Sequence, residues 1–519
     1  MSDSRRYNLS TKGSKPWAVA VADEIIALHP NEEVYTVAAG ISPSGVVHFG
    51  NFRDIMTAHM VRQVLQEKGK KTRLIFSWDN FDRLRKVPTG VPETFLEHIG
   101  KPLSKVPDPY GDLSSYAERF QQPFVEAMEK LGIEIEYKNQ TELYESGIYD
   151  EMIKRALGER GKIADVLLSF MSEKAMSAKE IDPVKYRENF YPISIYSRFT
   201  GKDSTKILSY DGDMGVTYYC AETGKEDTVD LRKDRIAKLS WKVDWPMRWN
   251  YEKVHFEPGG SDHAAPGSSY DVSSVIAKEV FKIDPPIFVE YMFVGIRGLG
   301  TKMSGSKGNA VSPLDLLDIY DPTLLLWLYL RKDPNQPFEL AFDSEIYRQY
   351  DEFDKEHGNN QAVSFRQLVG FGQIVQWQEE KLIKILDELG LDYDKNMILQ
   401  RLPLAKNWLV KYNPDEVIVL NTELNEEYGK TLSDKQKTLI KRLHDELEAK
   451  PDATITGLEF LAYQIPKNPE LSEVELKKEQ REFFKDVYNL LIGKDTGPRL
   501  GTFLWAADRA KVLQLLSID

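Results

Sequence analysis

The feature that most constrains the fold is a strand–helix–strand pattern near the N-terminus. Residues 34–40 form a nearly continuous apolar run that ends at Gly40, as in a strand covered on both faces of a parallel sheet. A second run of this kind spans 72–78. Apolar residues at helical spacing lie between the two runs and stop before Gly69: Ile55, Ala58, Val61, Val64 and Leu65. Two parallel strands joined by a helix predict a right-handed crossover in a doubly wound α/β sheet.

The rest of the chain predicts more than one domain. With 519 residues it exceeds the roughly 250–300 residues at which a single core stops growing. We expect further strands at 133–137 and 286–294 and a helix at 148–157. Turns and short alternating runs between about 160 and 240 indicate an insertion that interrupts the sheet. From about 345 onwards, charged amphipathic segments predict a mostly helical region.

Composition narrows the class of protein. A net charge of −13 argues against a broadly basic nucleic-acid-binding surface, although a local positive patch would be sufficient. The only cysteine, Cys220, rules out a disulfide within the chain and a multi-cysteine zinc site, which fits a reducing cytoplasm. No apolar stretch reaches the roughly 20 residues of a membrane span. No apolar segment follows the two N-terminal arginines, so we expect no secretory signal.

A loop between the first strand and its helix carries a histidine. Residues 43–51 read Pro-Ser-Gly-Val-Val-His-Phe-Gly-Asn and follow the carboxyl end of a parallel strand, where such folds bind ligands. The next helix offers free backbone N–H groups, to which His48 can add a hydrogen-bond donor for a phosphate. Gly50 would let a ligand approach the backbone closely. A histidine that only caps the helix explains the pattern equally well.

A second loop combines small residues with two lysines. Residues 302–309 read Lys-Met-Ser-Gly-Ser-Lys-Gly-Asn. The small residues leave backbone donors accessible to phosphate, and Lys302 and Lys307 supply positive charge. The loop lacks the Gly-x4-Gly-Lys-Ser/Thr pattern of a P-loop and follows the last strand rather than the first. A flexible solvated loop is the alternative explanation.

A third segment, 256–263, reads Phe-Glu-Pro-Gly-Gly-Ser-Asp-His and precedes a helix. The Asp262 carboxylate at the start of that helix can accept hydrogen bonds from ribose hydroxyls. An aspartate at this position can instead cap the helix. We favour the ribose role.

The three segments together resemble the class I aminoacyl-tRNA synthetases. Residues 48–51 resemble the early His-x-Gly-His/Asn element of that family, 302–309 its Lys-Met-Ser-Lys-Ser element, and 260–263 its Gly-x-Asp-Gln/His element. Their order, spacing and sheet context agree. The resemblance is most specific to the class I lysyl-tRNA synthetases and covers most of the chain, most strongly 35–88 and 241–309.

The resemblance implies a lysine–tRNA ligase, which converts lysine and ATP into lysyl-adenylate and transfers the lysyl group to the 3′-terminal ribose of tRNA(Lys). Catalysis is then expected from His48, Asn51, Lys302 and Lys307. ATP, accompanied by Mg²⁺, is expected to bind through Pro43, Gly45, His48, Gly50, Asn51, Gly260, Asp262, Met303, Ser304, Ser306 and Lys307. The lysine substrate is expected to meet Gly40, Ser42, Trp245, Trp249, His263 and Tyr291. Ordinary core packing remains an equally open explanation for each aromatic residue.

Two departures from the family pattern concern the site. The usual fourth-position lysine of the second element is Gly305 here, so it stays open whether Lys302 or Lys307 does most of the charge neutralisation. Relatives often carry a Cys-x-x-Cys element where this chain has one thiol, Cys220, followed by Ala-Glu-Thr. Structural zinc needs four ligands, so we expect no zinc in the insertion and no other resident metal.

The resemblance also suggests how the chain divides. We expect a Rossmann-type catalytic domain in two halves, 1–160 and 241–300, with an insertion, 161–240, between them. A signature-loop and stem-contact region, 301–345, and an α-helical anticodon-binding domain, 346–519, should follow. The helical domain resembles the α-helix cage of the glutamyl enzymes. Anticodon bases usually stack on aromatic or arginine planes, and the candidates are Phe371, Trp377, Trp408, Arg442 and Arg499. We expect a monomer.

Three alternatives remain. A glutamyl- or glutaminyl-type class I synthetase shares the helical C-terminal architecture. A small-molecule nucleotidyltransferase uses a similar His-x-Gly-His element, but is usually far shorter and lacks the helical region. A tRNA-binding relative without enzymatic activity would be expected to lose the phosphate residues, and all four are present: His48, Asn51, Lys302 and Lys307.

Overall fold

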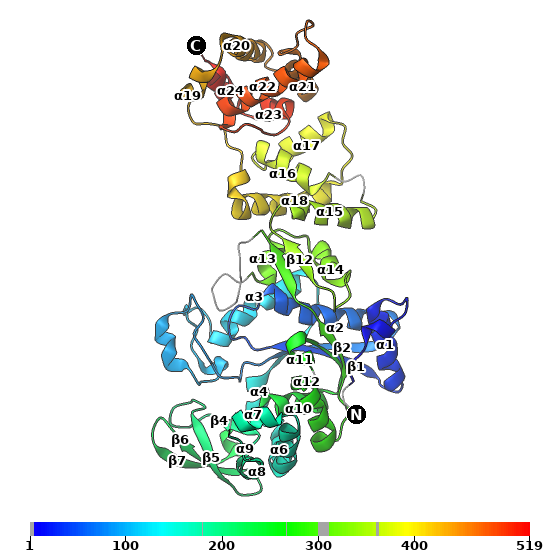
Figure 1. The fold of residues 1–519 in the computed structure, drawn as a ribbon, viewed down its shortest axis with the longest axis vertical. Helices are drawn as coiled ribbons and strands as arrows, with labels where there is room; N and C mark the ends of the chain where they lie inside the picture. The colour runs from blue at the N-terminus through cyan, green and yellow to red at the C-terminus, as the bar shows by residue number, and fades with distance from the viewer. Residues whose placement is uncertain (1–4, 179, 266, 299–310, 360–362, 519) are drawn as a thin grey trace. The chain divides into compact units, whose positions relative to one another are not determined.

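The computed structural model describes residues 5–178, 180–265, 267–298, 311–359 and 363–518 (Figure 1). The chain divides into two compact units, the first made mainly of residues up to 296 and the second mainly of residues from 341 onwards. Across these described ranges, no helix is both long enough and apolar enough to cross a bilayer.

A five-stranded parallel sheet forms the centre of the first unit. Its strand order is β10–β9–β1–β2–β3. The chain builds outwards from β1 to β2 and β3 on one side and later adds β9 and β10 on the other, which is the doubly wound arrangement that the sequence predicts. The strands are β1 (Val34–Ile41), β2 (Lys71–Trp78), β3 (Glu136–Asn139), β9 (Val254–Gly260) and β10 (Ile287–Tyr291).

Helices cover both faces of this sheet, which explains its uninterrupted apolar strands. Tyr35 and Val37 in β1 are fully buried. The helix α2 (Phe49–Glu67) packs on β1, β2 and β9, with α1 (Trp17–Leu28) beside it. On the opposite face, α10 (Trp241–Glu252) packs against β9 and α12 (Ser269–Ile276) (Figure 1). A strand covered on both sides has no solvent-facing positions, so polar residues do not alternate along it.

Further elements of this part of the chain lie outside the central sheet. The strands β11 and β12 pair with each other. The bounds of these elements are α3 (Tyr116–Lys130), α4 (Gln140–Ser146), α5 (Asp150–Gly158), α11 (Ser261–Ala264), β11 (Val294–Arg297), α13 (Pro313–Leu317), α14 (Pro322–Leu330) and β12 (Phe338–Ala341).

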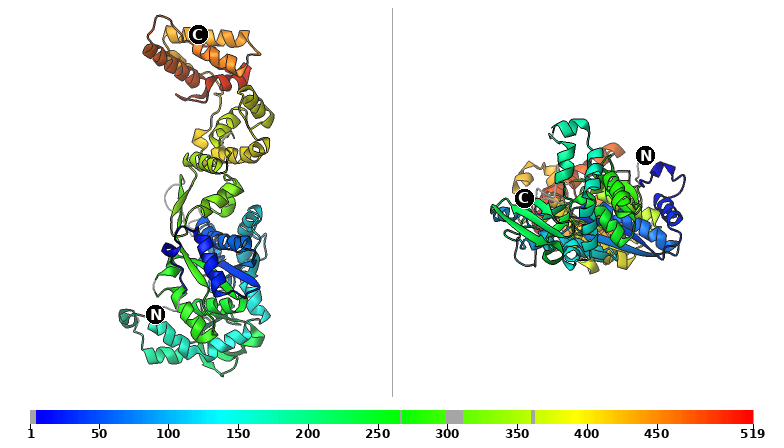
Figure 2. Two further views of the ribbon diagram at one scale, coloured as in Figure 1. Left: turned by 90° about the vertical axis from the view of Figure 1, so that its right-hand side faces the viewer. Right: turned by 90° about the horizontal axis from the view of Figure 1, so that it is seen from below.

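The insertion predicted between the two halves of the sheet contains strands of its own. The strands β5, β6 and β7 form an antiparallel sheet, and β4 pairs with β8, separately from the five-stranded sheet (Figures 1 and 2). The bounds are α6 (Arg160–Ser169), α7 (Glu173–Ala178), α8 (Pro183–Asn189), β4 (Ile193–Ile195), β5 (Thr205–Tyr210), β6 (Gly215–Cys220), β7 (Lys225–Asp230), α9 (Leu231–Asp234) and β8 (Ala237–Leu239).

Two strand predictions were wrong in their limits. The strand expected at 133–137 is β3, three residues later, because Ile133 is buried in the turn after α3 instead of pairing with β2. The run 286–294 is interrupted rather than continuous. Met292 donates its N–H to the Pro334 carbonyl at 2.8 Å, and its own carbonyl accepts from Arg53 at 2.9 Å. These tertiary bonds take the ladder positions that a continuous strand would need.

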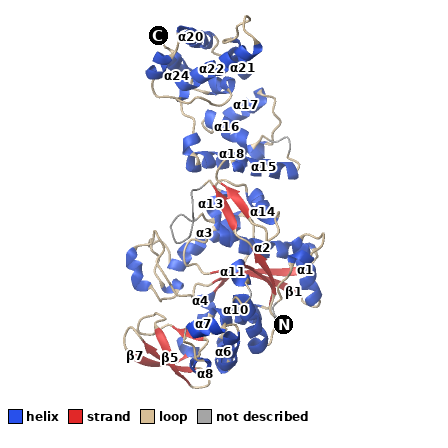
Figure 3. Cartoon of the chain, in the orientation of Figure 1, coloured by secondary structure: helices blue, strands red, loops and turns tan. Residues whose placement is uncertain are grey.

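From residue 345 onwards, the described residues form helices and no strand (Figure 3), as the sequence predicts. A core of leucine, isoleucine and aromatic side chains holds the last helices together. The bounds are α15 (Glu345–Glu356), α16 (Phe365–Ile374), α17 (Glu379–Glu388), α18 (Lys395–Asn407), α19 (Glu426–Thr431), α20 (Asp434–Ala449), α21 (Ile455–Gln464), α22 (Glu473–Ile492), α23 (Leu500–Ala506) and α24 (Arg509–Leu516).

Candidate active site

The candidate site lies at the carboxyl ends of β1 and β9, where the strand order reverses. Doubly wound folds bind ligands at such switch points. Asp54 on α2 accepts a hydrogen bond from Gly40 N–H at 3.2 Å, and the Tyr291 hydroxyl donates to the same carboxyl group. A Cβ atom on Gly260 would lie 3.7 Å from the Tyr291 hydroxyl. The structure therefore brings together Gly40, Gly260 and Tyr291, which come from three different strands.

His48 is the N-cap of α2, and its two ring nitrogens have different surroundings. Nδ1 accepts a hydrogen bond from Gly50 N–H at 3.1 Å. Burial lowers the pKa of the His48 imidazole, so the ring is neutral near pH 7. A neutral imidazole whose Nδ1 accepts carries its proton on Nε2. His48 therefore caps the helix with one nitrogen and keeps a donor for a ligand on the other.

The structure requires glycine at position 50 for a reason other than the one that the sequence suggests. A Cβ atom at this position would lie 2.9 Å from Cε1 and 3.0 Å from Nδ1 of His48. The neighbour that requires glycine is therefore the imidazole ring rather than a ligand. Asn51 donates its backbone N–H to the His48 carbonyl at 2.9 Å, and its side chain is partly exposed.

The end of β1 and the loop after it are held in place by contacts with β2 and α3. A Cβ atom on Gly40 would lie 2.8 Å from the Ser77 carbonyl oxygen, so only glycine lets β1 end so close to β2. The Tyr116 hydroxyl donates to the Ser44 carbonyl at 2.9 Å. Pro43 is buried, whereas the other two predicted loop residues are partly exposed: Ser42 and Gly45.

Asp262 is not a helix cap. The N-cap of α11 is Gly260, and no side chain caps this helix. The Asp262 side chain is 72 % exposed and lies 3.7 Å from His263 Nε2, measured from Oδ2. The structure thus removes the capping explanation and leaves a carboxylate that is accessible to a ligand.

The tryptophans of α10 form a stack beside this edge. Trp241 and Trp245 are stacked with ring centroids 5.0 Å apart, and His263 lies 5.7 Å from Trp245. Trp249 is 1 % exposed and donates its Nε1–H to Glu257 at 2.7 Å. A direct contact between Trp249 and a substrate would need this side chain to move. Trp245, 4 % exposed, lies between Trp241 and Trp249, and the partly exposed His263 lies beside it.

Two buried carboxyl groups of the site, Asp54 and Glu257, were not predicted from the sequence. Burial raises the pKa of Glu257 to about 7, and the raised pKa of Asp54 has the same main cause, reinforced by the neighbouring charge of Glu257. A charged residue inside the apolar strand run 254–260 and another on the buried side of α2 were the available signals.

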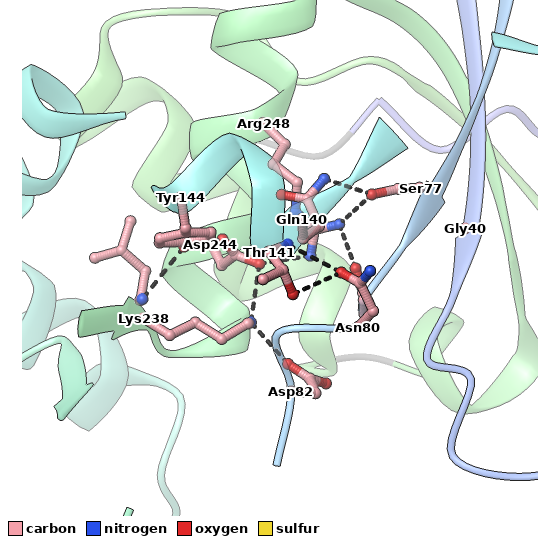
Figure 4. A network of polar contacts seen from close by, with 12 residues as sticks. Gly40, Ser77, Asn80, Asp82, Gln140, Thr141, Tyr144, Lys238, Asp244 and Arg248 are labelled. Carbon is pink, nitrogen blue, oxygen red and sulfur yellow. Dashed lines mark hydrogen bonds and ion pairs between the residues drawn. The ribbon is translucent and has the colours of Figure 1, made fainter. Parts of the chain in front are cut away.

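A buried network of ion pairs beside α10 was not predicted from the sequence either (Figure 4). Arg248 donates to Asp79 at 2.6 Å and also pairs with Asp244, while Lys238 pairs with Asp244 at 3.3 Å and with Asp82 at 2.8 Å. Burial alone would raise the pKa of Asp244, but Arg248 and Lys238 hold it below its usual value. The network joins the insertion, through Lys238, to α10 and to the end of β2.

The same network reaches the first strand of the site. Arg248 donates to Ser77 Oγ at 2.8 Å, and Gln140 donates to the same oxygen at 2.7 Å. Ser77 is also the residue of β2 that Gly40 approaches closely. Arg248 therefore fixes the position of α10 and of the carboxyl end of β2 at the same time (Figure 4).

The lysine-containing loop at 302–309 lies outside the described residues, and with it the predictions for Lys302, Met303, Ser304, Ser306 and Lys307. Val311 is the first described residue after it. The Phe49 N–H, next to His48, donates to the Val311 carbonyl at 3.0 Å, and the Tyr329 hydroxyl donates to the Phe49 carbonyl at 2.9 Å. The chain after this loop is thus anchored beside His48.

One group of potential metal ligands occurs among the described residues, away from the site: His29, Glu32 and His255. His255 Nδ1 accepts a hydrogen bond from Thr36 N–H at 3.0 Å, so its proton belongs on Nε2, the nitrogen that a metal would need. The Arg5 guanidinium also lies 3.4 Å from His29 Nε2. These residues do not fit a metal ion.

The five anticodon candidates differ in the second unit. Trp408 is fully buried and donates Nε1–H to the Phe342 carbonyl at 2.9 Å, and Phe371 is 9 % exposed. Arg442 donates to the Ile465 carbonyl. Trp377 is partly exposed. Arg499 differs from these because it lines a cavity of about 370 Å³ together with Tyr463, Phe484 and Tyr488.

Comparisons with known proteins agree with the motifs. A family model described as "tRNA synthetases class I (K)" matches residues 15–368. The lysine–tRNA ligase of Pyrococcus horikoshii is 35 % identical, covering 97 % of this chain and 99 % of its own length. That of Streptomyces coelicolor is 36 % identical and covers 96 % and 98 %. A solved glutamate tRNA ligase from Elizabethkingia meningosepticum covers 94 % of this chain and 100 % of that chain, at 13 % identity and a TM-score of 0.48.

Proposed function

The chain belongs to the class I lysine–tRNA ligases, and from this premise we propose how its residues share the reaction. The activity is ATP-dependent activation of L-lysine to lysyl-adenylate, followed by transfer of the lysyl group to the 3′-terminal ribose of tRNA(Lys). The observation that carries the assignment of the site is the neutral His48, whose Nε2–H remains available at the switch point of the sheet. The full-length match to lysine enzymes sets aside the three alternatives raised by the sequence.

In the first step, an oxygen of the lysine carboxylate attacks the α-phosphorus of ATP, and pyrophosphate leaves. No covalent bond to the protein is needed, so the protein acts by positioning and by neutralising charge. We assign His48 Nε2–H and Asn51 to the phosphates and Lys302 and Lys307 to the departing pyrophosphate. The hydrogen bond between Phe49 and Val311 supports a shared site, since it anchors the chain four residues after Lys307 next to His48.

ATP is assigned further contacts at both strand ends. The loop residues after β1 would border the phosphates, and Asp262 would accept from the ribose hydroxyls. The exposure of Asp262 and its freedom from capping support this role. The complete proposed set is Pro43, Gly45, His48, Gly50, Asn51, Gly260, Asp262, Met303, Ser304, Ser306 and Lys307. Mg²⁺ is proposed to accompany ATP.

The amino acid is assigned to the space between β1 and the α10 stack. Gly40 and Ser42 would meet the α-amino and α-carboxyl groups, while the side chain would lie against Trp245, His263 and Tyr291. Trp249 is proposed to act through its hydrogen bond to Glu257 rather than by direct contact, because it is buried.

Replacing Trp245 by alanine should raise the KM for lysine more than the KM for ATP. The indole is stacked on Trp241 and lies near His263, so its loss opens the amino-acid side of the site. Because Trp245 is also 4 % exposed and part of a core cluster, Trp245→Phe serves as the milder companion variant. Steady-state pyrophosphate exchange measures both constants. Equal changes in the two KM values would indicate a packing role instead.

We propose that the insertion holds no structural zinc. Tetrahedral zinc sites use four thiolate, imidazole or carboxylate ligands. At the end of β6 the donor set is one thiol, Cys220, with the hydroxyls of Ser197 and Thr223 hydrogen-bonded to it. These side chains do not fit zinc. Metal analysis of the protein purified from zinc-supplemented culture should find no stoichiometric zinc, and one tightly held zinc per chain would contradict the proposal.

The helical region 346–519 is proposed to bind the anticodon. Single-stranded bases are held by stacking on aromatic and guanidinium planes. Arg499 and Tyr463 fit this chemistry best, since both line the cavity between α21, α22 and α23, and the Tyr463 side chain is 49 % exposed. The buried Trp408 and Phe371 are better explained by packing. The catalytic halves, the insertion and the stem-contact region keep their proposed limits of 1–160, 241–300, 161–240 and 301–345.

We also propose that the protein acts as a monomer in the cytoplasm. Its only thiol is buried in β6, as suits a reducing compartment where disulfides do not form. Sedimentation analysis of the purified protein tests the monomeric state.

The experiment that tests the function is ATP–pyrophosphate exchange with each amino acid in turn, with and without tRNA(Lys). Among the amino acids tested, only lysine should support exchange. The reaction must be run with tRNA, because several class I enzymes activate their amino acid only when tRNA is bound. Exchange supported by glutamate or glutamine, and not by lysine, would overturn the proposal.

A further inference from the structure

The pocket side of β9 presents a carboxylate that has no cationic partner in the protein. Glu257 projects towards α10, where Trp249 donates to its Oε2 at 2.7 Å. Among the described residues, neither Glu257 nor Asp54 forms an ion pair with a lysine, arginine or histidine. By contrast, the carboxylates of Asp79, Asp244 and Glu252 nearby are all paired. A buried carboxylate without a cation is costly to keep, so such a group suggests a cationic ligand.

The depth of Glu257 matches the length of the substrate. Gly260 marks the end of β9 at the site edge, and Glu257 lies three residues further into the sheet, with its Cα paired to Phe288. Three residues of a strand span about 10 Å. A lysine with its α-groups at the strand end extends its four-carbon stem about 6 Å inwards, which brings the ε-ammonium group into the part of the site next to Glu257.

The surroundings of Glu257 suit a primary ammonium group. Trp245 is 4 % exposed, and its indole lies beside the Glu257 carboxyl group. Aromatic faces attract cations, and Trp245 is stacked on Trp241 and packs against Trp249, which donates to Glu257. A glutamate or glutamine substrate would bring either a repelled carboxylate or an uncharged amide to this place.

Resting on the proposed function, we propose that Glu257 receives the ε-ammonium group of the lysine substrate and thereby sets the amino-acid specificity. Asp54, hydrogen-bonded to Gly40 N–H and to the Tyr291 hydroxyl, lies nearer the strand end. The ion pair forms only when lysine binds, so in the unliganded protein Glu257 is hydrogen-bonded to Trp249 but has no paired cation among the described residues.

Glu257→Gln is the decisive variant, because glutamine keeps an oxygen that can accept from Trp249 and removes only the charge. We expect the KM for lysine in pyrophosphate exchange to rise at least 100-fold, with the KM for ATP within threefold of wild type. The preference for lysine over norleucine, which lacks the ε-ammonium, should fall by the same factor. Glu252→Gln is the matched control, since this nearby carboxylate is paired with Arg73 and Lys138, and it should leave the lysine KM within threefold.

The wild-type protein supplies a second readout. Burial raises the pKa of Glu257 to about 7, and an ammonium binds only the ionised carboxylate. The lysine KM should therefore rise up to tenfold as the pH falls from 8 to 6, and Glu257→Gln should abolish this dependence. The other titratable groups near Glu257 are Arg248, Asp79 and Asp54, and Asp262 and Tyr291 lie near Asp54. All of them are unchanged in the variant.

The outcomes separate cleanly. An unchanged lysine KM in Glu257→Gln, or an equal loss for lysine and norleucine, would overturn the inference while leaving lysine activation intact. Absence of lysine-dependent exchange in the wild-type protein would instead overturn the proposed function. If the variant fails to fold, a flat pH dependence of the lysine KM in the wild-type protein overturns the inference by itself.

Discussion

Replacing His48 by alanine is expected to lower the rate of lysine-dependent ATP–pyrophosphate exchange by about 10²–10³-fold, the usual effect of removing one charge-stabilising donor. Nε2–H is the donor in question, because Nδ1 is already engaged with Gly50 N–H and the ring is neutral. The substitution also removes the N-cap of α2, which costs about 0.5–2 kcal/mol of stability. Exchange kinetics and thermal unfolding of the same variant measure the two effects.

His48→Asn separates the two roles. Asparagine is among the best N-cap residues, but its shorter side chain ends in an amide that cannot reach as far as the imidazole. We expect His48→Asn to unfold close to the wild-type temperature and to be as slow in exchange as His48→Ala. Wild-type exchange rates in either variant would remove His48 from the phosphate site.

Replacing Arg248 by methionine should lower the free energy of unfolding by about 3–5 kcal/mol, because it removes the cation paired with the buried Asp79 and one of the two cations paired with Asp244. Arg248 pairs with both Asp79 and Asp244, and Asp244 is completely buried. Arg187→Met is the control, since its pair with Asp165 is more than half exposed on both sides, and surface pairs contribute about 0–1 kcal/mol. Urea unfolding followed by tryptophan fluorescence reports on this region, because Arg248 lies 5.1 Å from the Trp241 ring.

The destabilisation caused by Arg248→Met should also depend on pH. Without the guanidinium, the pKa of Asp79, which burial already raises, should rise further, and the pKa of Asp244 should rise because it loses one of the two cations that lower it. A buried carboxyl group with a raised folded pKa destabilises the fold increasingly as the pH rises from the unfolded to the folded pKa, and the penalty shrinks as the pH falls back through that range. The gap between wild type and variant should therefore narrow from pH 8 to pH 5. A gap that stays constant over this range would show that lost packing, and not buried charge, is the cause.

The central part of the fold could be predicted because its signals are local. The apolar run of β1, the helical spacing in α2 and the run of β2 all lie within 45 residues of one another. The limits of β3 and the break after β10 could not be predicted, because they depend on the partners that each backbone group finds. The Met292 N–H and carbonyl bind Pro334 and Arg53, which are far away in sequence.

The site was predictable to the extent that it is written in short motifs. The positions of His48, Gly260 and Asp262 follow from loops at the ends of strands. The roles of Glu257, Asp54 and Arg248 do not, because each gains its meaning from a distant partner. Arg248, for example, pairs with Asp79, 169 positions away. The two explanations offered for His48 turned out to be compatible, since capping occupies only one ring nitrogen.

The structure of the protein bound to ATP and a non-reactive lysine analogue tests the central claim most directly. We expect phosphate oxygens within hydrogen-bonding distance, about 2.7–3.2 Å, of His48 Nε2 and of Lys302 or Lys307. We also expect the ammonium of the analogue at Glu257. A triphosphate bound away from the end of β1, or a lysine-containing loop on a different surface from His48, would contradict the claim.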